Sequence, residues 1–324
     1  MKTILVSGTS GIVGYGVLKS LRLNPGQYKL IGITIYDDSV APAFCDIFVQ
    51  APITNDEKYI PWLCEIIKTH NVDMIIPGIE ADMIAWNINK EILNKTGVHI
   101  LLNKPELIEL CSDKWTFFKK LSSTNSKLAI KSSLTGSFED FEKALGVPFL
   151  LKPRKGFASK GIVKIENKET FEKNKDNLGS ILMAQPIVGN IEEEYTVSAF
   201  FDNISNLLCY MILRRKLAKE GFTEKAEVVE INGIKEAIEE LKEIFKPIGP
   251  TNFQFRLHEG KLKLLEINPR ISSATSIRTA FGYNESEMSV NYFLNNIIPT
   301  QPEIKKGHAV RYTEDYIFYD SNNL

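Results

Sequence analysis

Residues 251–270 read TNFQFRLHEGKLKLLEINPR, and this stretch decides what kind of site the chain can build. Two runs of alternating character flank His258-Glu259-Gly260, which predicts an antiparallel hairpin with its loop at 258–260. Side chains on a strand alternate between the two faces of the sheet. One face is therefore expected to be apolar, with Phe253, Phe255, Leu265 and Ile267. The other face is expected to carry Gln254, Glu266 and Asn268, with Gln254 opposite Leu264 and diagonal to Glu266.

The polar face of this hairpin has the donor chemistry of a metal site. One carboxylate and two amide oxygens suit a hard cation such as Mg²⁺, which takes oxygen ligands and shares them with substrate phosphates. Arg270 follows the cluster directly and is placed to contact a phosphate. From this segment alone, an exposed hairpin face that meets only water is the alternative.

A second candidate segment lies upstream. Lys152 ends an apolar run at 149–152 and is followed by PRKGFASKG at 153–161, a basic loop bounded by Gly156 and Gly161. A strand at 162–165 would complete a hairpin whose loop covers phosphates through backbone N–H groups. It is not a Walker A loop, because Ile162 and Val163 stand where Lys and Ser or Thr are required. A solvated basic loop is the alternative.

The first hundred residues show a different rhythm. Apolar runs at 3–6, 30–35, 74–77 and 98–102 alternate with amphipathic stretches at 13–23, 59–69 and 84–94, which predicts a parallel α/β sheet. Gly8-Thr9-Ser10-Gly11-Ile12-Val13-Gly14 follows the first strand, and Asp37 and Asp38 follow the second. This weakly resembles a dinucleotide fingerprint. A turn that only packs a strand against a helix is the alternative.

Further elements are expected along the rest of the chain. A helix at 114–121 would begin after Ser112 or Asp113 as N-cap. Strands are predicted at 181–184, 195–201 and 207–213, a helix at 235–245, and a C-terminal strand near 309–312.

Composition excludes several classes of protein. The 324 residues carry 39 basic and 40 acidic side chains, and a net charge of -1 offers no field for nucleic acid. The four cysteines, at 45, 64, 111 and 209, form no CxxC pair, so neither a zinc site nor a disulfide framework is expected. No apolar stretch reaches the length of a membrane span. We expect a cytoplasmic protein without a membrane partner.

The order NFQF at 252–255 and EINPRISSATS at 266–276 resembles the ATP-grasp superfamily. The resemblance runs from about residue 3 to residue 290 and is greatest to the ATP-binding half of carbamoyl phosphate synthetase large chains. It implies an α/β chain with an N-terminal Rossmann-like pre-ATP-grasp domain over 1–105. A two-lobed α+β ATP-grasp fold would follow, with a small lobe over 106–187 that carries the phosphate-covering loop. A large lobe over 188–324 would carry the metal-binding hairpin and the C-terminal tail.

The same resemblance implies roles for individual residues. Glu266, Asn268 and Gln254 would hold one or two Mg²⁺ ions, with Mn²⁺ as a substitute, and Arg270 and Lys152 would act on the transferred phosphoryl group. The ATP-binding residues would be Lys114, Lys152, Gly156, Ser159, Gly161 and the hinge residues Gln185, Pro186, Ile187 and Val188. The ribose-binding acid would be Glu192 by spacing or Glu194 by its Glu-Tyr-Thr-Val context, and both stay open.

Candidate substrate-binding residues are Gly8, Gly11, Ser272, Ser273, Arg278 and Arg214. A structural, salt-bridged Arg278 is an equal alternative, and Arg214 also fits a solvated charge run.

The implied activity is an ATP-dependent carboxylate–amine or carboxylate–thiol ligase that acts through an acylphosphate on small molecules. Carbamoyl phosphate synthesis itself is not expected, because the chain has one ATP-grasp unit where the large chain carries two. The alternatives are an NAD(P)-dependent reductase that uses the turn at 8–14 and an ATP-binding protein without catalysis. A homodimer is the expected oligomer, if one forms.

Overall fold

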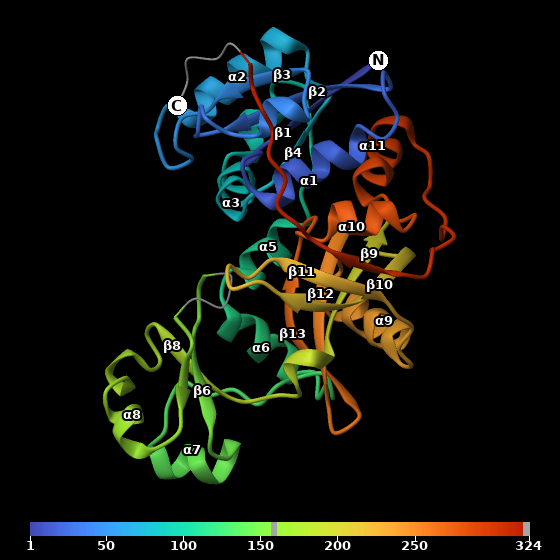
Figure 1. Ribbon diagram of the computed structural model, residues 1–324. Coiled ribbons are helices and arrows are strands. Elements are labelled where there is room, and N and C mark those ends of the chain that lie inside the picture. The colour runs from blue at the N-terminus through green and yellow to red at the C-terminus, as the bar shows by residue number, and fades with distance from the viewer. Residues whose placement is uncertain (157–160, 320–324) are drawn as a thin grey trace.

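The computed structural model describes residues 1–156 and 161–319 and contains three β-sheets. Figure 1 shows the first sheet in the upper part of the molecule and the other two in the lower part. The first sheet is formed by β1 (Lys2–Val6), β2 (Tyr28–Thr34), β3 (Ile47–Gln50), β4 (Met74–Ile76) and β5 (His99–Ile100). Its order is β3-β2-β1-β4-β5 and every pair is parallel, so the predicted parallel sheet is confirmed. The central strands β1, β2 and β4 are buried on both faces, which is why they read as nearly continuous apolar runs.

Helices cover both faces of this parallel sheet. Helices α2 (Tyr59–His70), α3 (Glu80–Ile88) and α4 (Lys90–Asn94) pack on the face that carries Leu5 and Ile31. Helix α1 (Ile12–Leu21) packs on the opposite face, against Ile4 and Val6.

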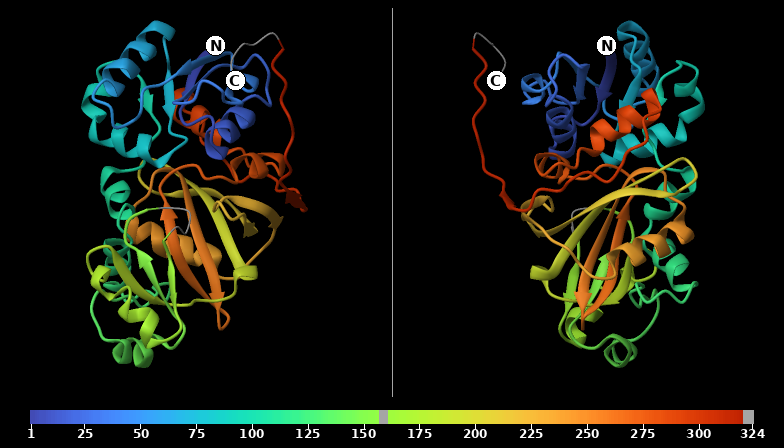
Figure 2. Two further views of the ribbon diagram at one scale, coloured as in Figure 1. Left: turned by 60° about the vertical axis from the view of Figure 1, so that its left-hand side comes forward. Right: turned by 90° about the vertical axis from the view of Figure 1, so that its right-hand side faces the viewer.

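The core on the α1 face is completed by residues from the far end of the chain. Ile271 and Val290 belong to the same buried cluster as Ile4, Val17 and Met74. Val290 lies on α11 (Glu285–Asn295), which follows α10 (Thr275–Ala280). Figure 2 shows α10 and α11, in orange and red, against the blue N-terminal domain.

Two helices, α5 (Pro105–Cys111) and α6 (Lys114–Ser122), lead into a small antiparallel sheet. This sheet has the order β7-β6-β8 and consists of β6 (Phe149–Pro153), β7 (Val163–Ile165) and β8 (Leu182–Pro186). Helices α7 (Phe138–Leu145) and α8 (Lys168–Glu172) cover it. Its core is aromatic and contains Phe138, Phe141, Phe149 and Phe171.

The third sheet is antiparallel and has the order β13-β12-β9-β10-β11-β14. Its strands are β9 (Glu194–Phe201), β10 (Leu207–Leu217), β11 (Thr223–Val228), β12 (Gly249–His258), β13 (Lys261–Asn268) and β14 (His308–Val310). Helices α6 and α9 (Ile234–Phe245) contribute to the core that buries Phe253 and Phe255. Three short 3₁₀ turns complete the described elements, at Ala41–Ala43, Lys175–Asn177 and Ile191–Glu193.

The β12–β13 hairpin forms, but the predicted register is wrong. Its loop is the two-residue turn Glu259-Gly260, with φ values of 50° and 72°, so that His258 pairs with Lys261. Positive φ at both central residues is typical of the two-residue turns that match strand twist. The register then shifts between Gln254 and Phe255, which brings Gln254 directly opposite Glu266.

This register shift leaves Leu265 as the extra residue of a β-bulge. Phe255 consequently pairs with Leu264, and Leu264 is fully buried. Leu265, which was expected in the apolar face, is only partly buried at the edge of the core.

Several other expectations about elements also change. The predicted helix over 84–94 is two helices, because the Asn89 side chain donates to the Ala85 carbonyl and ends α3. Strands β3 and β11 had not been predicted. Strand β10 runs to Leu217, so Arg214 lies within a strand rather than at its end. Asp113, not Ser112, caps α6 by accepting a hydrogen bond from the Trp115 N–H. No helix of the described chain is long and apolar enough to cross a membrane.

Candidate active site

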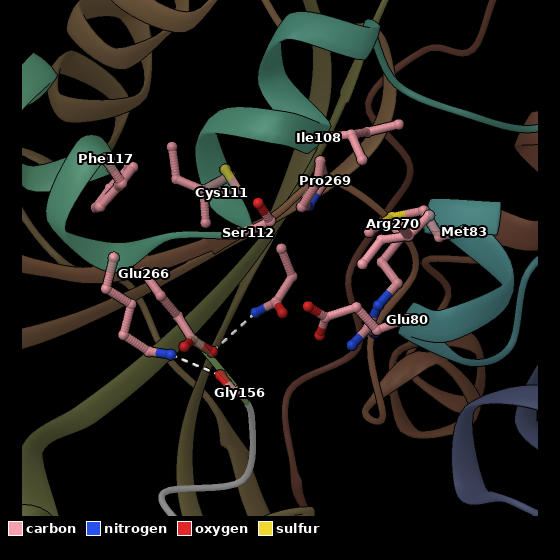
Figure 3. A pocket seen from close by; sticks show the side chains of 14 residues that line it. Glu80, Met83, Ile108, Cys111, Ser112, Phe117, Gly156, Glu266, Pro269 and Arg270 are labelled. Atoms are coloured by element: carbon pink, nitrogen blue, oxygen red, sulfur yellow. Dashed lines mark hydrogen bonds between the residues drawn. The ribbon is translucent and has the colours of Figure 1, made fainter. Parts of the chain in front are cut away.

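A cleft lies where the N-terminal domain, α5–α6 and the end of β13 meet (Figure 3). Its empty space is about 580 Å³, including the part that opens to solvent. It is lined by Glu80, Met83 and Ile84 of α3, by residues of α5 and α6 that include Cys111, Lys114 and Phe117, by Gly156, and by 266–270. Five residues expected in the site, Lys114, Gly156, Glu266, Asn268 and Arg270, are thus brought together from three separate segments.

Glu266 and Asn268 present oxygens to this cleft. The Asn268 side-chain N–H₂ donates to Glu266 Oε1 at 3.0 Å, which leaves Asn268 Oδ1 directed elsewhere as an acceptor. Gln254 differs, because its Oε1 already accepts a hydrogen bond of 2.6 Å from Arg215. A carboxylate and one amide oxygen therefore fit a Mg²⁺ ion as they stand, whereas Gln254 would have to exchange Arg215 for the metal.

Asn252, which pairs with Asn268 across the hairpin, supports this donor set. Its side-chain N–H₂ donates to the Thr196 hydroxyl at 2.7 Å. Its Oδ1 is buried and accepts no hydrogen bond from the part of the chain that the structure describes. A buried oxygen without a donor is costly in a protein interior, and a cation beside Asn268 would lower that cost.

The basic side of the cleft is fixed by an ion pair. Asp113 accepts from Arg154 at 2.6 Å and also caps α6, so it joins the start of that helix to the end of β6. The Lys114 ammonium, in the first turn of α6, donates to the Gly156 carbonyl at 2.6 Å. Arg154 and Asp113 thereby hold Lys114 next to the start of the predicted phosphate-covering loop. Ser159 lies outside the described residues, and Gly161 has a φ of 75° that favours glycine.

Lys152 lies on β6 with its ammonium 5.3 Å from the centre of the Phe118 ring. The pKa of Lys152 is lowered to about 8, mainly by burial and also by the nearby charge of Lys114, while the charge of Glu266 acts in the opposite direction. Such a lysine gains most from an anionic ligand, because a phosphate would supply the negative charge that its surroundings lack.

Arg270 is held at the opposite end of the cleft. One of its guanidinium N–H groups donates to the Ile271 carbonyl at 2.9 Å. Burial lowers the pKa of Arg270, and the negative charges of Glu80 and Glu266 act in the opposite direction. Arginine stays protonated even so. The arrangement provides a fixed positive charge beside two carboxylates.

The predicted hinge follows β8. Gln185 is buried and donates to the Ser132 hydroxyl at 2.7 Å, Pro186 ends the strand, and Ile187 leads to Val188, which lies in the main core. Of the two open ribose candidates, Glu194 is 4 % exposed and accepts bidentate hydrogen bonds from Arg215 and Arg256. The Glu192 side chain is 65 % exposed, and its nearest cation is Lys216 at 3.9 Å. The Glu194 carboxylate is therefore fully engaged in ion pairs within the protein, whereas the Glu192 carboxylate is accessible to a ligand.

Other expected substrate residues do not line the cleft. Arg278 is fully buried and pairs with Glu285, which is 1 % exposed, and it also donates to the Ser272 hydroxyl. This is the structural alternative for Arg278. Ser273 accepts from the Thr223 N–H at 3.4 Å. Arg214 is exposed and pairs with Glu227.

The glycine turn after β1 has a packing role. A Cβ on Gly14 would lie 2.4 Å from the Gly8 carbonyl oxygen, so helix α1 reaches β1 only through glycine. Gly11 donates its N–H to the same carbonyl. Gly8 lines a second, mostly apolar pocket with about 650 Å³ of empty space, including the part that opens to solvent, at the carboxyl ends of β1, β2 and β3. This second pocket and the cleft lie on either side of the first turn of α3.

The sequence reading missed Glu80. The available signal was an acidic residue four positions after the strand that ends in Ile76, because ligands of parallel sheets bind at the carboxyl ends of the strands. Glu80 lies near Arg270, which is 190 positions away in the sequence. This proximity depends on how the domains pack together, and no local sequence pattern predicts it.

The chain is similar in sequence to several known proteins. Residues 182–316 match the family model described as ATP-grasp in the biosynthetic pathway with Ter operon. The carbamoyl phosphate synthase large chain of Methanosarcina barkeri is 23 % identical over 267 residues, which cover 74 % of this chain and 25 % of that protein. The C-terminal section of the Aquifex aeolicus large chain is 22 % identical over 69 % of this chain and 45 % of its own length. The chain thus spans between about a quarter and a half of these relatives.

Solved structures share the fold over nearly the whole chain. N5-carboxyaminoimidazole synthetase from Staphylococcus aureus, complexed with ADP, superimposes with a TM-score of 0.74 at 20 % identity, covering 94 % of this chain and 80 % of that one. Biotin carboxylase from Campylobacter jejuni gives a TM-score of 0.73 at 16 % identity, with coverages of 95 % and 74 %. The chain has the ATP-grasp fold and resembles the ATP-binding half of carbamoyl phosphate synthase large chains, with the family match itself carried by residues 182–316.

Proposed function

We propose that this protein is an ATP-dependent ligase that joins a small-molecule carboxylate to an amine, or to a thiol, through an acylphosphate. ATP would bind between the small sheet and the large antiparallel sheet. The N-terminal domain would act as a Rossmann-like wall of the acceptor site and would not bind a dinucleotide. The proposal rests on the likeness to ATP-grasp ligases and on one observation in particular: Glu266, Asn268 and Arg270 line the same cleft as Lys114.

Five residues have a task in the proposed reaction. Lys114 and Lys152 would bind the ATP phosphates, and the hydrogen bond from Lys114 to the Gly156 carbonyl supports a covering loop that begins beside Lys114. Arg270 would bind the phosphoryl group as it passes to the carboxylate oxygen. Glu266 and Asn268 would hold Mg²⁺, which supplies charge neutralisation on the phosphates when bound. Catalysis of phosphoryl transfer is mostly positioning and charge stabilisation, so no nucleophilic side chain is needed.

The remaining ATP contacts follow the same proposal. Gln185 to Val188 would face adenine, and Glu192 is our choice for the ribose, because the carboxylate of Glu194 is already held by two arginines. Gln254 would join the metal ligands only after its hydrogen bond to Arg215 is released.

Hydroxylamine trapping tests the function without knowledge of the amine. The protein is incubated with Mg²⁺-ATP, hydroxylamine and pools of carboxylic acids, and hydroxamate and ADP are measured together. An acylphosphate reacts with hydroxylamine to give hydroxamate and phosphate, and its formation from ATP releases ADP. One pool should therefore yield hydroxamate and ADP in equal amounts. Glu266→Gln should abolish them, and Glu106→Gln, exposed on α5, is the matched control. ATP-dependent ADP release without hydroxamate in any pool would reject the acylphosphate, and binding of NAD(P)H without ATP binding would favour a reductase.

A further inference from the structure

The first turn of α3 presents an acidic side chain to the cleft for which the reaction described so far has no use. Figure 3 shows the Glu80 carboxylate turned into the cleft, on the side that faces Glu266, with Arg270 next to it. Glu80 is the first residue of α3 and lies four residues after Ile76, the last residue of β4. A carboxylate in the first helical turn is stabilised there by the helix dipole.

The cations of the cleft leave this carboxylate without a hydrogen bond. Lys114 donates to the Gly156 carbonyl, and Arg270 donates to the Ile271 carbonyl. Over residues 1–156 and 161–319, Glu80 takes part in no side-chain hydrogen bond and in no ion pair within 4.0 Å. Its neighbour Asp82 differs, since it accepts from Thr54 and Tyr59 on the other side of the helix turn. Glu80 is therefore available to a ligand, and Asp82 is part of the structure.

The chemistry of the cleft limits what that ligand is. Glu266 and Asn268 form the oxygen pair suited to a metal, and the positive side chains suit phosphate and carboxylate. Anionic reactants are repelled by Glu80. The one reactant of a carboxylate–amine ligase that carries positive charge before it reacts is the amine, which is an ammonium ion at neutral pH.

We propose that Glu80 binds the amine substrate as its ammonium ion and orients its nitrogen toward the acyl carbon, an inference that rests on the proposed ligase function. The acceptor is then an alkylammonium compound and not a thiol. The ammonium passes one proton to the Glu80 carboxylate and becomes nucleophilic. Its nitrogen forms the new bond to the acyl carbon, the bond from that carbon to the phosphate oxygen breaks, and phosphate leaves with the electron pair. The second proton leaves the nitrogen and is taken up by the phosphate.

The test compares a charged nucleophile with an uncharged one in the same variant. With the acid pool that yields hydroxamate, products are measured with hydroxylamine, which is largely uncharged near neutral pH, and with a mixture of ammonium chloride and the common amino acids. The quantity of interest is the ratio of amide to hydroxamate. A lost charge-assisted hydrogen bond changes such a ratio by about tenfold to a hundredfold.

We expect Glu80→Gln to lower the ratio at least about tenfold, Glu80→Asp to restore part of it, and Glu91→Gln, exposed on α4, to leave it unchanged. An unchanged ratio in Glu80→Gln would overturn the inference. So would a parallel loss of both products or a raised Mg²⁺ requirement, because Glu80 would then act through Arg270 or the metal. Absence of hydroxamate from the unmodified protein in every pool would instead reject the ligase function, and this inference with it.

Discussion

Lys152 should give the proposed nucleotide site a pH dependence that can be measured without knowing either substrate. Its pKa is lowered to about 8, first by burial and then by the charge of Lys114. The charged form binds phosphate, and a bound phosphate raises the pKa again. The affinity for a phosphate ligand should therefore fall as the pH rises through the pKa that Lys152 has in the free protein.

The size of the effect follows from that pKa. With a pKa of about 8, Lys152 is about three-quarters protonated near pH 7.5 and about 3 % protonated near pH 9.5. If only the charged form binds strongly, the dissociation constant for Mg²⁺-ADP rises about 25-fold between those two pH values. An unperturbed lysine, with a pKa of about 10.4, would change affinity by little more than about 10 % over the same range.

Isothermal titration with Mg²⁺-ADP across this range is the direct assay. Lys152→Met should bind weakly at every pH, close to the unmodified protein at the alkaline end. Lys164→Met, on the neighbouring strand β7 with an exposed side chain, should retain the full pH dependence. A flat profile in the unmodified protein would refute the reasoning. So would an unaltered profile in Lys152→Met, because the titrating group would then lie elsewhere.

Three other outcomes follow from the structure. Glu266→Gln should lower Mg²⁺-dependent ATP turnover at least about a hundredfold, and recovery of the rate at high Mg²⁺ would show weakened binding alone. Glu285→Ala leaves the guanidinium of Arg278 buried without its partner, so urea unfolding should show a loss of about 3–5 kcal/mol. The double variant Arg278→Met/Glu285→Leu should regain much of that stability, and equal losses in both would contradict the assignment. Gly14→Ala should cost about 1–3 kcal/mol by thermal melt, because its Cβ would lie 2.4 Å from the Gly8 carbonyl oxygen; an unchanged melting temperature would show that α1 is free to shift.

Local sequence patterns predicted part of the candidate site. Alternation along 251–270 placed Glu266 and Asn268 on one face of a hairpin, and both line the cleft. The same alternation failed in detail, because a bulge at Leu265 moves Gln254 opposite Glu266. A bulge depends on how the hairpin packs against β9 and the core, which a single strand pattern does not encode.

A salt-bridged Arg278 was one of two alternatives from the sequence, but its partner was not identified. Arg278 and Glu285 are seven positions apart, yet their pairing depends on how α10 meets α11 and on burial against Ser198. Glu80 reaches the cleft only because the N-terminal domain docks against the end of β13. Both cases involve tertiary contacts between separate elements, so the spacing of residues along the chain did not identify the contacting partners.

The shared core between the first and last parts of the chain has a consequence for biosynthesis. The α1 face of the parallel sheet is closed by Ile271 and Val290, which leave the ribosome almost three hundred residues after β1. Domains usually fold as units, with N-terminal ones first as they are synthesised. Here the nascent N-terminal domain would carry an uncovered apolar surface during most of translation, and it would reach its final packing only once α11 has emerged. A ribosome stalled before that helix would display an incomplete domain with a surface suited to chaperone binding.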